Sequence, residues 1–176
     1  AFAEKAAHVT MLQRSPTYVV SRPSQDKIAN RLRKILPRKT AYGLTRWKNV
    51  GLQMLFFNRA RTAPDKVRAM IKNLAQKELG PDYPVSTHFN PKYNPWDQRM
   101  CLIPDSDLFK ELKSGRASVV TDTIDTFTET GIKLSSGQEL KADIVVSATG
   151  LDLQFLGGAE VKVDGETIDL SKRLTY

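Results

Sequence analysis

The segment ELKADIVVSATGLD, residues 139–152, constrains the fold more than any other part of the sequence. At its centre, residues 144–146 form an uninterrupted β-branched apolar run, which is typical of a strand buried on both faces of a sheet. The run ends in the small residues Ala148, Thr149 and Gly150. Because small residues let a ligand or another backbone come close, we expect a buried strand that ends at a site or a chain crossing.

Length and composition favour one globular domain. A chain of 176 residues with 40% hydrophobic residues can bury a core, and its single Cys101 excludes an internal disulfide, which agrees with a cytoplasmic location. The best candidate for a membrane span, residues 50–57, is far shorter than the roughly 18 residues required. The chain starts without a methionine and stops abruptly, so we expect both ends to be cuts in a longer protein.

Three stretches repeat apolar residues at intervals of three and four, the spacing of amphipathic helices. They are Ile28, Leu32, Ile35 and Leu36; Leu44, Trp47, Val50, Gly51, Met54 and Leu55; and Val67, Met70, Ile71, Leu74 and Ala75. Pro37 and Pro64 separate these helices, residues 62–65 (TAPD) are expected to cap the third, and Gly80 ends it. The whole segment is basic: residues 22–78 carry 15 Lys and Arg against 3 Asp and Glu, whereas the rest carries 12 against 16.

The remaining segments predict shorter elements. Residues 1–7 are helical in composition, and residues 8–12 alternate as a strand. Residues 81–104 combine five prolines with aromatic side chains, which favours an ordered loop. Residues 105–115 predict a short helix whose N-terminal carboxylates, Asp105 and Asp107, favour the helix dipole. From residue 117 onward, turns at Gly131 and Gly137 divide a β-meander that leads into the apolar run.

A polar and basic pair, Gln13 and Arg14, follows the first predicted strand. Doubly wound sheets bind ligands beyond the carboxyl ends of their strands, and a guanidinium there can hold a phosphate with two hydrogen bonds. From this stretch alone, an anion-binding arginine and a solvated loop arginine both stay open.

Three segments in this order carry a resemblance to a known family: LQRSPTYVVSRP, NPWDQRMCLIPDSDLF and SSGQELKADIVVSATG. The chain resembles flavin-dependent monooxygenases that use NADPH, particularly the Baeyer–Villiger branch. The resemblance implies an α/β fold: a partial doubly wound dinucleotide-binding domain of a two-dinucleotide flavoprotein, with a helical insertion and a β-meander. It also implies four parts: residues 1–26 in the NADPH-binding domain, 27–80 as the basic helical insertion, 81–150 as the rest of that domain, and 151–176 as the return into an FAD-binding domain.

The same resemblance implies the cofactors, the substrates and the site. Arg14 would bind the 2′-phosphate of NADPH with Gln13 and Ser15 beside it, and the turn at residues 148–150 would lie where the chain crosses toward the FAD domain. FAD and NADPH are the expected cofactors. The expected substrates are O₂ and a ketone or thioether. No catalytic residue and no metal ligand is assigned within the chain, and nucleic acid is not an expected partner.

Two family signatures are missing from the sequence. No G-x-G-x-x-G turn is present, and neither His8 nor His88 has the neighbours of the F-x-G-x-x-x-H-x-x-x-W-P sequence of Baeyer–Villiger enzymes. We therefore expect this chain alone to bind neither nucleotide well and to be inactive, with both histidines structural.

The basic segment and the loop at residues 96–99 each leave alternatives open. The basic helices have three interpretations: an insertion packed on the rest of the enzyme, a peripheral contact with an anionic membrane, or nucleic-acid binding. The rival to the enzyme is a non-enzymatic module that binds anionic membranes or partners through these helices. Nucleic-acid binding is disfavoured because no recognition module accompanies the charge. The loop either shapes a site or is held to the core by Trp96 and an Asp97–Arg99 pair.

Overall fold

The computed structural model describes residues 2–150 and 155–169. It divides the chain into two compact units, Ala1–Lys141 and Ala142–Tyr176. Of the predicted return into an FAD-binding domain, residues 151–154 and 170–176 lie outside the described residues.

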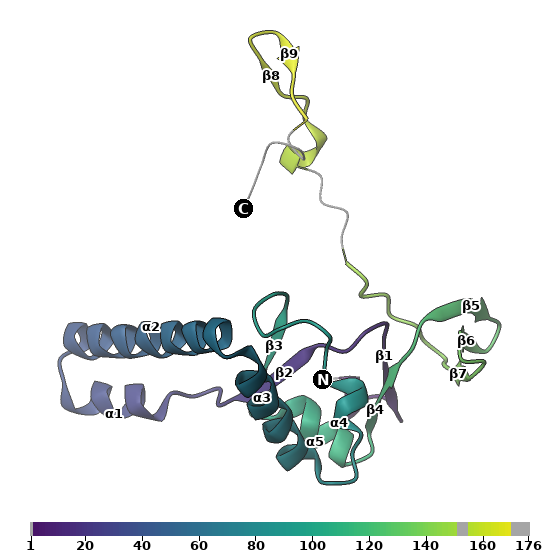
Figure 1. Ribbon diagram of the computed structural model, residues 1–176, viewed down its shortest axis with the longest axis horizontal. Coiled ribbons are helices and arrows are strands. Elements are labelled where there is room, and N and C mark those ends of the chain that lie inside the picture. The colour runs from purple at the N-terminus through teal and green to yellow at the C-terminus, as the bar shows by residue number, and fades with distance from the viewer. Residues whose placement is uncertain (1, 151–154, 170–176) are drawn as a thin grey trace. The chain divides into compact units, whose positions relative to one another are not determined.

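The first unit contains both strands and helices (Figure 1). Its strands are β1 (Val9–Gln13), β2 (Tyr18–Arg22), β3 (Met100–Pro104), β4 (Ala117–Thr121), β5 (Ile124–Thr128), β6 (Gly131–Leu134) and β7 (Glu139–Lys141). Its helices are η1 (Phe2–Glu4), α1 (Lys27–Ile35), α2 (Arg38–Thr62), α3 (Pro64–Leu79), α4 (Val85–His88) and α5 (Asp107–Lys113). The three basic helices, the helix after residue 105 and the meander were therefore predicted correctly, and the α/β class is confirmed.

Two parallel strand pairs form the centre of this unit. β1 pairs with β4, so that Gln13 lies opposite Thr121, and β2 pairs with β3, so that Arg22 lies opposite Pro104. β5, β6 and β7 form the antiparallel meander. The two parallel pairs are separate two-stranded sheets among the described residues, so the specific doubly wound sheet stays a prediction.

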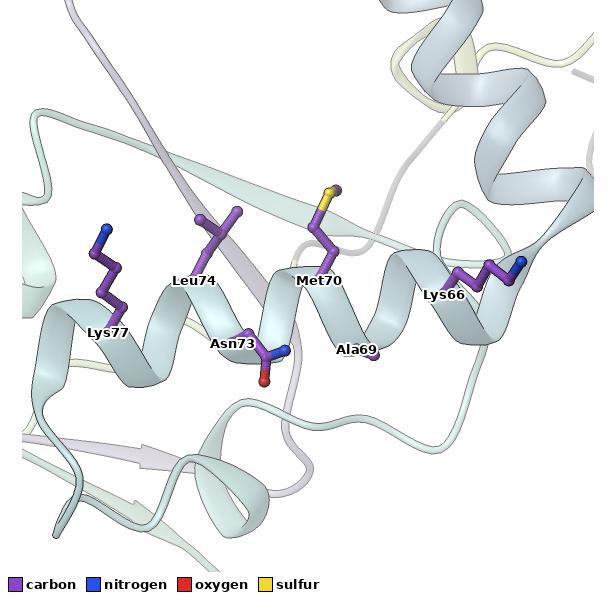
Figure 2. Close-up of a pocket in the computed structure, with 6 residues that line it drawn as sticks. All are labelled: Lys66, Ala69, Met70, Asn73, Leu74 and Lys77. Atoms are coloured by element: carbon purple, nitrogen blue, oxygen red, sulfur yellow. The ribbon is translucent and has the colours of Figure 1, made fainter.

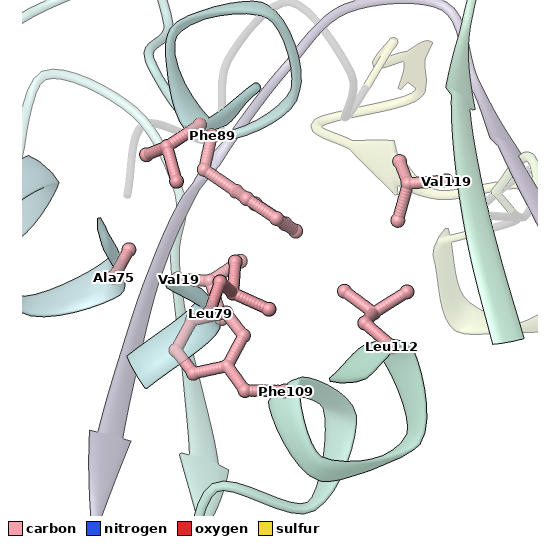
Figure 3. Packing of buried hydrophobic residues seen from close by; sticks show 8 residues of the cluster. Val19, Ala75, Leu79, Phe89, Phe109, Leu112 and Val119 are labelled. Atoms are coloured by element: carbon pink, nitrogen blue, oxygen red, sulfur yellow. The ribbon is translucent and has the colours of Figure 1, made fainter. Parts of the chain in front are cut away.

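One hydrophobic core joins both parallel pairs to the helices (Figure 3). Its buried members are Val19 of β2, Ala75 and Leu79 of α3, Val85 of α4, Phe89, Phe109 and Leu112 of α5, and Val119 of β4. The rings of Phe89 and Phe109 meet edge to face, with centroids 5.7 Å apart. Helix α3 is thus part of the α/β core, although its sequence is continuous with the basic segment.

Helices α1 and α2 form an antiparallel hairpin (Figure 1). Asp26 begins α1: its Oδ1 accepts hydrogen bonds from the backbone N–H groups of Ile28 and Ala29, both at 3.0 Å, which is the usual role of an N-cap carboxylate. Its other oxygen accepts from Lys48 of α2, and this contact lowers the pKa of Asp26 below its ordinary value. One side chain therefore both starts α1 and joins it to α2.

The apolar run at residues 144–146 is not a strand in the structure, so that prediction was wrong. Ile144 is 81% exposed, and residues 142–150 belong to no described strand. A strand needs a neighbour to hydrogen-bond its backbone, and no described segment pairs with this one. The second unit instead contains η2 (Phe155–Gly158) and a short hairpin of β8 (Lys162–Val163) and β9 (Glu166–Thr167). The turn of this hairpin is Asp164–Gly165, with φ of 52° and 87°, the Asp-Gly pattern favoured in two-residue hairpin loops.

Two helix termini also differ from expectation. Of the predicted helix at residues 1–7, the described residues 2–7 form one 3₁₀ turn, Phe2–Glu4. Helix α3 has Ala63 at its N-cap, and alanine has no polar side-chain atom to cap a helix; the Thr62 hydroxyl donates to the carbonyl of Asn58 at 2.9 Å. Pro64, whose missing N–H would have no partner at that position, starts α3.

The core predicts that replacing two phenylalanines by alanine will change the stability of the protein by very different amounts. Phe109 is 2% exposed, whereas Phe127 on β5 is 64% exposed. Replacing Phe109 by Ala should reduce the free energy of unfolding by about 3–5 kcal/mol, because it leaves a cavity among α3, α5 and the strands. Phe127→Ala should change it by no more than about 0.5 kcal/mol. Urea unfolding of the two variants measures both values, and equal losses would contradict the core described here.

Candidate functional site

The carboxyl edge of the β1–β4 pair carries a cluster of three polar side chains, Gln13, Thr121 and His88, called here the edge cluster. The side-chain amide of Gln13 donates to the Thr121 hydroxyl and to the backbone carbonyl of His88, both at 2.8 Å. The backbone carbonyl of Gln13 accepts from the N–H of Asp122 at 3.0 Å. The end of β1 is therefore fixed to β4 and to α4 by both its backbone and its side chain.

His88 completes the edge cluster as a neutral side chain. Its Nδ1 lies 2.8 Å from the Thr121 hydroxyl oxygen, which already accepts a hydrogen bond from Gln13. The hydroxyl proton is thus free to be donated to Nδ1. Burial of the ring lowers the pKa of His88 below its ordinary value. The lowered pKa favours the neutral ring, whose Nδ1 can accept this hydrogen bond.

Arg14 and Ser15 follow directly after this fixed end of β1, and both are exposed. Among the residues that the structure describes, no side chain pairs with the Arg14 guanidinium. The three predicted residues therefore have different roles. The amide of Gln13 forms hydrogen bonds within the protein, whereas the Arg14 guanidinium is open to an anion and Ser15 is accessible beside it. A guanidinium held at a strand end with its donors unused can bind a phosphate or carboxylate with two hydrogen bonds.

The other predicted site segment, Ala148, Thr149 and Gly150, belongs to the second unit and is exposed. Gly150 has φ of +124°, a conformation that residues with a side chain rarely adopt. The hydroxyls of Ser147 and Thr149 lie 3.4 Å apart. The structure does not position this segment relative to Arg14.

A second polar network holds the loop between α4 and β3, and the sequence did not reveal it. Tyr18 donates to the carbonyl of Tyr93 at 2.7 Å and accepts from Nε of Arg68 at 3.1 Å. Arg68 also donates to Oδ1 of Asn94 at 2.7 Å. The Tyr18 ring is buried, and this burial raises the pKa of its phenol. Because Arg68 lies on α3, the network ties the loop to a core helix.

The predicted Asp97–Arg99 pair is not formed. Asp97 pairs with Arg61 of α2, with 2.6 Å between Nη1 and Oδ1, whereas Nε of Arg99 donates to Sγ of Cys101 at 3.3 Å. Trp96 contacts the rings of Phe56 and Phe57 on α2 edge to face and has a left-handed backbone φ of 70°. The loop is thus held through α2, and its tryptophan has a strained backbone conformation of a kind often found at functional sites.

Neither a metal site nor a membrane-spanning helix is found in the described ranges 2–150 and 155–169. No group of three or more His, Cys, Asp or Glu side chains in these ranges could hold a metal ion. None of the helices there is both long enough and apolar enough to cross a membrane.

Comparison with known proteins gives strong matches along nearly the whole chain. The FAD-containing monooxygenase EthA of Mycobacterium tuberculosis is 50% identical over 171 residues, which cover 97% of this chain and 35% of that protein. The chain is similar to FAD-containing monooxygenases. EthA of Mycolicibacterium smegmatis is 49% identical, and the "Probable FAD-binding monooxygenase AlmA" of Acinetobacter baylyi is 52% identical, each over 97% of this chain. These names confirm the resemblance to flavin-dependent monooxygenases.

The match covers only part of each relative. The chain spans about a third of the length of the curated FAD-containing monooxygenases that it matches. No protein-family model matches the chain, and no solved structure matches it significantly. The match favours the flavoenzyme over the non-enzymatic module.

The edge cluster predicts a pH dependence of stability. The pKa of His88 is lowered in the folded protein, so the unfolded chain binds the proton more readily. The contribution of His88 to the free energy of unfolding is therefore complete above the unfolded pKa of about 6.5. It decreases as the pH falls through that value. NMR titration should place the His88 midpoint below about 6.5, and thermal unfolding should show stability decreasing in this range.

His88→Gln is the control, because it should remove this part of the pH dependence. Carboxylates with lowered pKa values, such as Asp26 and Asp122, do not interfere, since their contributions decrease only below about pH 4. A His88 midpoint above 6.5 would contradict the neutral role of this ring.

Proposed function

We propose that this chain is part of an NADPH- and FAD-dependent monooxygenase. The enzyme would insert one oxygen atom of O₂ into a ketone or oxidise a heteroatom such as a thioether sulfur. Identity of about 50% with FAD-containing monooxygenases along nearly the whole chain supports the class of enzyme. The NADPH assignment is supported chiefly by Arg14, an exposed guanidinium after a parallel strand whose end is fixed by the edge cluster.

Within this proposal, the β1–β4 pair belongs to a doubly wound NADPH-binding domain. Ligands of such sheets lie beyond the carboxyl ends of the strands, which is the edge where Arg14 and Ser15 are found. Residues 1–26 and 81–150 would form this domain, with residues 27–80 inserted into it. Residues 151–176 would lead into the FAD-binding domain through the turn at Gly150.

The residues present fit one end of NADPH. The planar guanidinium of Arg14 matches a phosphate in charge and geometry, and the 2′-phosphate distinguishes NADPH from NADH. The pyrophosphate would need a glycine-rich turn at a helix start, which this chain does not contain. Arg14 would therefore provide cofactor selectivity, with the edge cluster as its support.

The flavin supplies the oxygen chemistry when it is bound, and the protein positions the reactants. In this chain, the described residues would hold and orient the reactants. Gln13 fixes the strand end that carries Arg14. Arg68 holds the loop to α3 through hydrogen bonds to Tyr93 and Asn94. Gly150 permits a backbone turn that a larger residue would strain.

Replacement of Arg14 by Ala in the full-length enzyme tests this proposal. The change should lower kcat/KM for NADPH roughly 10- to 150-fold. This corresponds to about 1.5–3 kcal/mol of binding energy, because a charge-assisted contact with the 2′-phosphate is lost. The kinetics with NADH, which lacks that phosphate, should stay nearly unchanged. The kcat/KM of Arg14→Lys for NADPH should lie between those of Arg14→Ala and the unsubstituted protein, since lysine keeps the charge but cannot form two parallel hydrogen bonds.

Arg116→Ala is a matched control, because Arg116 pairs with Glu111 beside the opposite, amino end of β4. It should leave the preference for NADPH unchanged. Equal losses with NADPH and NADH in Arg14→Ala would mean that this residue supports the fold and does not recognise the phosphate.

A further inference from the structure

Helix α2 exposes a continuous apolar stripe. Its residues recur at intervals of three and four, which places them on one face of the helix. They are Leu44, Trp47, Met54 and Leu55, with Gly51 between Trp47 and Met54. All four side chains are at least half exposed, and Trp47 is 73% exposed. In α3, by contrast, the row of apolar residues spaced four apart is buried: Val67, Ile71, Ala75 and Leu79. The stripe on α2 is therefore a helix face that the described residues leave uncovered.

The stripe continues into a groove between α2 and α3. Leu55 belongs to both, and the open groove of about 560 Å³ is lined by Leu52, Leu55, Phe56, Arg59, Lys66, Val67 and Met70. Beyond it, an open hollow lies along the outer side of α3, where Met70 and Leu74 lie between Lys66 and Lys77 (Figure 2). Apolar side chains thus line this surface from α2 to α3, and each charged residue that lines the groove or the hollow is cationic.

The hairpin that carries the stripe has no negative side chain. Residues 27–62 contain no Asp or Glu. They contain the cations Lys27, Arg31, Arg33, Lys34, Arg38, Lys39, Arg46, Lys48, Arg59 and Arg61. Asp26 and Asp97, outside this range, pair with Lys48 and Arg61. A partner for the hairpin must therefore accept apolar side chains and supply negative charge in the same place.

We propose that α2 and the adjoining α2–α3 groove dock this protein on an anionic lipid surface. A bilayer interface offers acyl chains for the stripe and negative head groups for the cations, and exposed tryptophan is suited to the boundary between them. A second copy of the chain is a poor partner, because it would bring an equally cationic hairpin against the first. This surface is distinct from the edge of the β1–β4 pair, and its test measures binding and not turnover.

The experiment is co-sedimentation of the full-length protein with vesicles. Phosphatidylcholine vesicles are compared with vesicles that contain three parts phosphatidylglycerol to seven parts phosphatidylcholine. The protein should sediment only with the anionic vesicles. Its binding should weaken as salt rises above about 0.1 M, since the surface attraction decays within a Debye length of about 10 Å there.

Variants separate the apolar contribution from the charged one. Trp47→Ala should weaken partitioning about 10- to 100-fold, the range expected for removing one inserted aromatic side chain. Arg46→Gln should weaken it about five-fold, the value expected for one cation near the surface. Phe127→Ala, an exposed aromatic position on β5, is the matched control and should bind as the unsubstituted protein does. Thermal unfolding of each variant verifies that its fold is retained.

Three results would overturn the proposal. Absence of binding to anionic vesicles would mean that another part of the full-length protein covers the stripe. Equal losses for Trp47→Ala and Phe127→Ala would mean that binding does not involve α2. Binding to a short DNA duplex, without binding to anionic vesicles at the same salt, would assign the charge to nucleic acid instead.

Discussion

The parallel pairing of β1 with β4 is the constraint on which the rest of the structure depends. Two parallel strands cannot be joined by a tight turn, because the chain must return to the starting end before the second strand begins. Helices α1 to α5 and the β2–β3 pair all lie within that return, between Gln13 and Ala117. The core forms where α3 and α5 bury one side against Val19 and Val119.

The same pairing determines the chemistry at the carboxyl edge. Because β1 and β4 run in the same direction, Gln13 and Thr121 end side by side, and the amide of Gln13 is used to connect them and to reach His88. This use leaves Arg14 as the charged group that the strand end presents to solvent. Fixing the last residue of the strand limits the positions that the next side chain can occupy, which is what recognition of a phosphate requires.

Helices α2 and α3 show how one kind of sequence pattern leads to two outcomes. Both repeat apolar residues at helical spacing, yet α3 buries Val67 and Ile71 while α2 exposes Trp47 and Leu55. Helix α3 buries one side in the core beside Val19 and Tyr18 of β2. Helix α2 instead contacts α1 through the Lys48–Asp26 pair and reaches the core near its C-terminal end, through Phe56 and Ala60. The cationic side chains and the uncovered apolar face therefore occur together on this hairpin, which contributes Ala60 and Phe56 to the core.

The sequence by itself determined the elements whose causes are local. Helical periodicity, prolines and the Gly80 stop located α1, α2 and α3 to within a few residues, and the glycine turns located the meander. Similarity along the chain also indicated the class of enzyme, and Arg14 was recognised as a strand-end cation. Only the tertiary structure decided that Gln13 bonds to Thr121 and His88, that Asp97 pairs with Arg61 and not Arg99, and that residues 144–146 stay exposed. These contacts join residues far apart in the chain or require a neighbouring strand, and spacing along one sequence carries no information about which distant groups will meet.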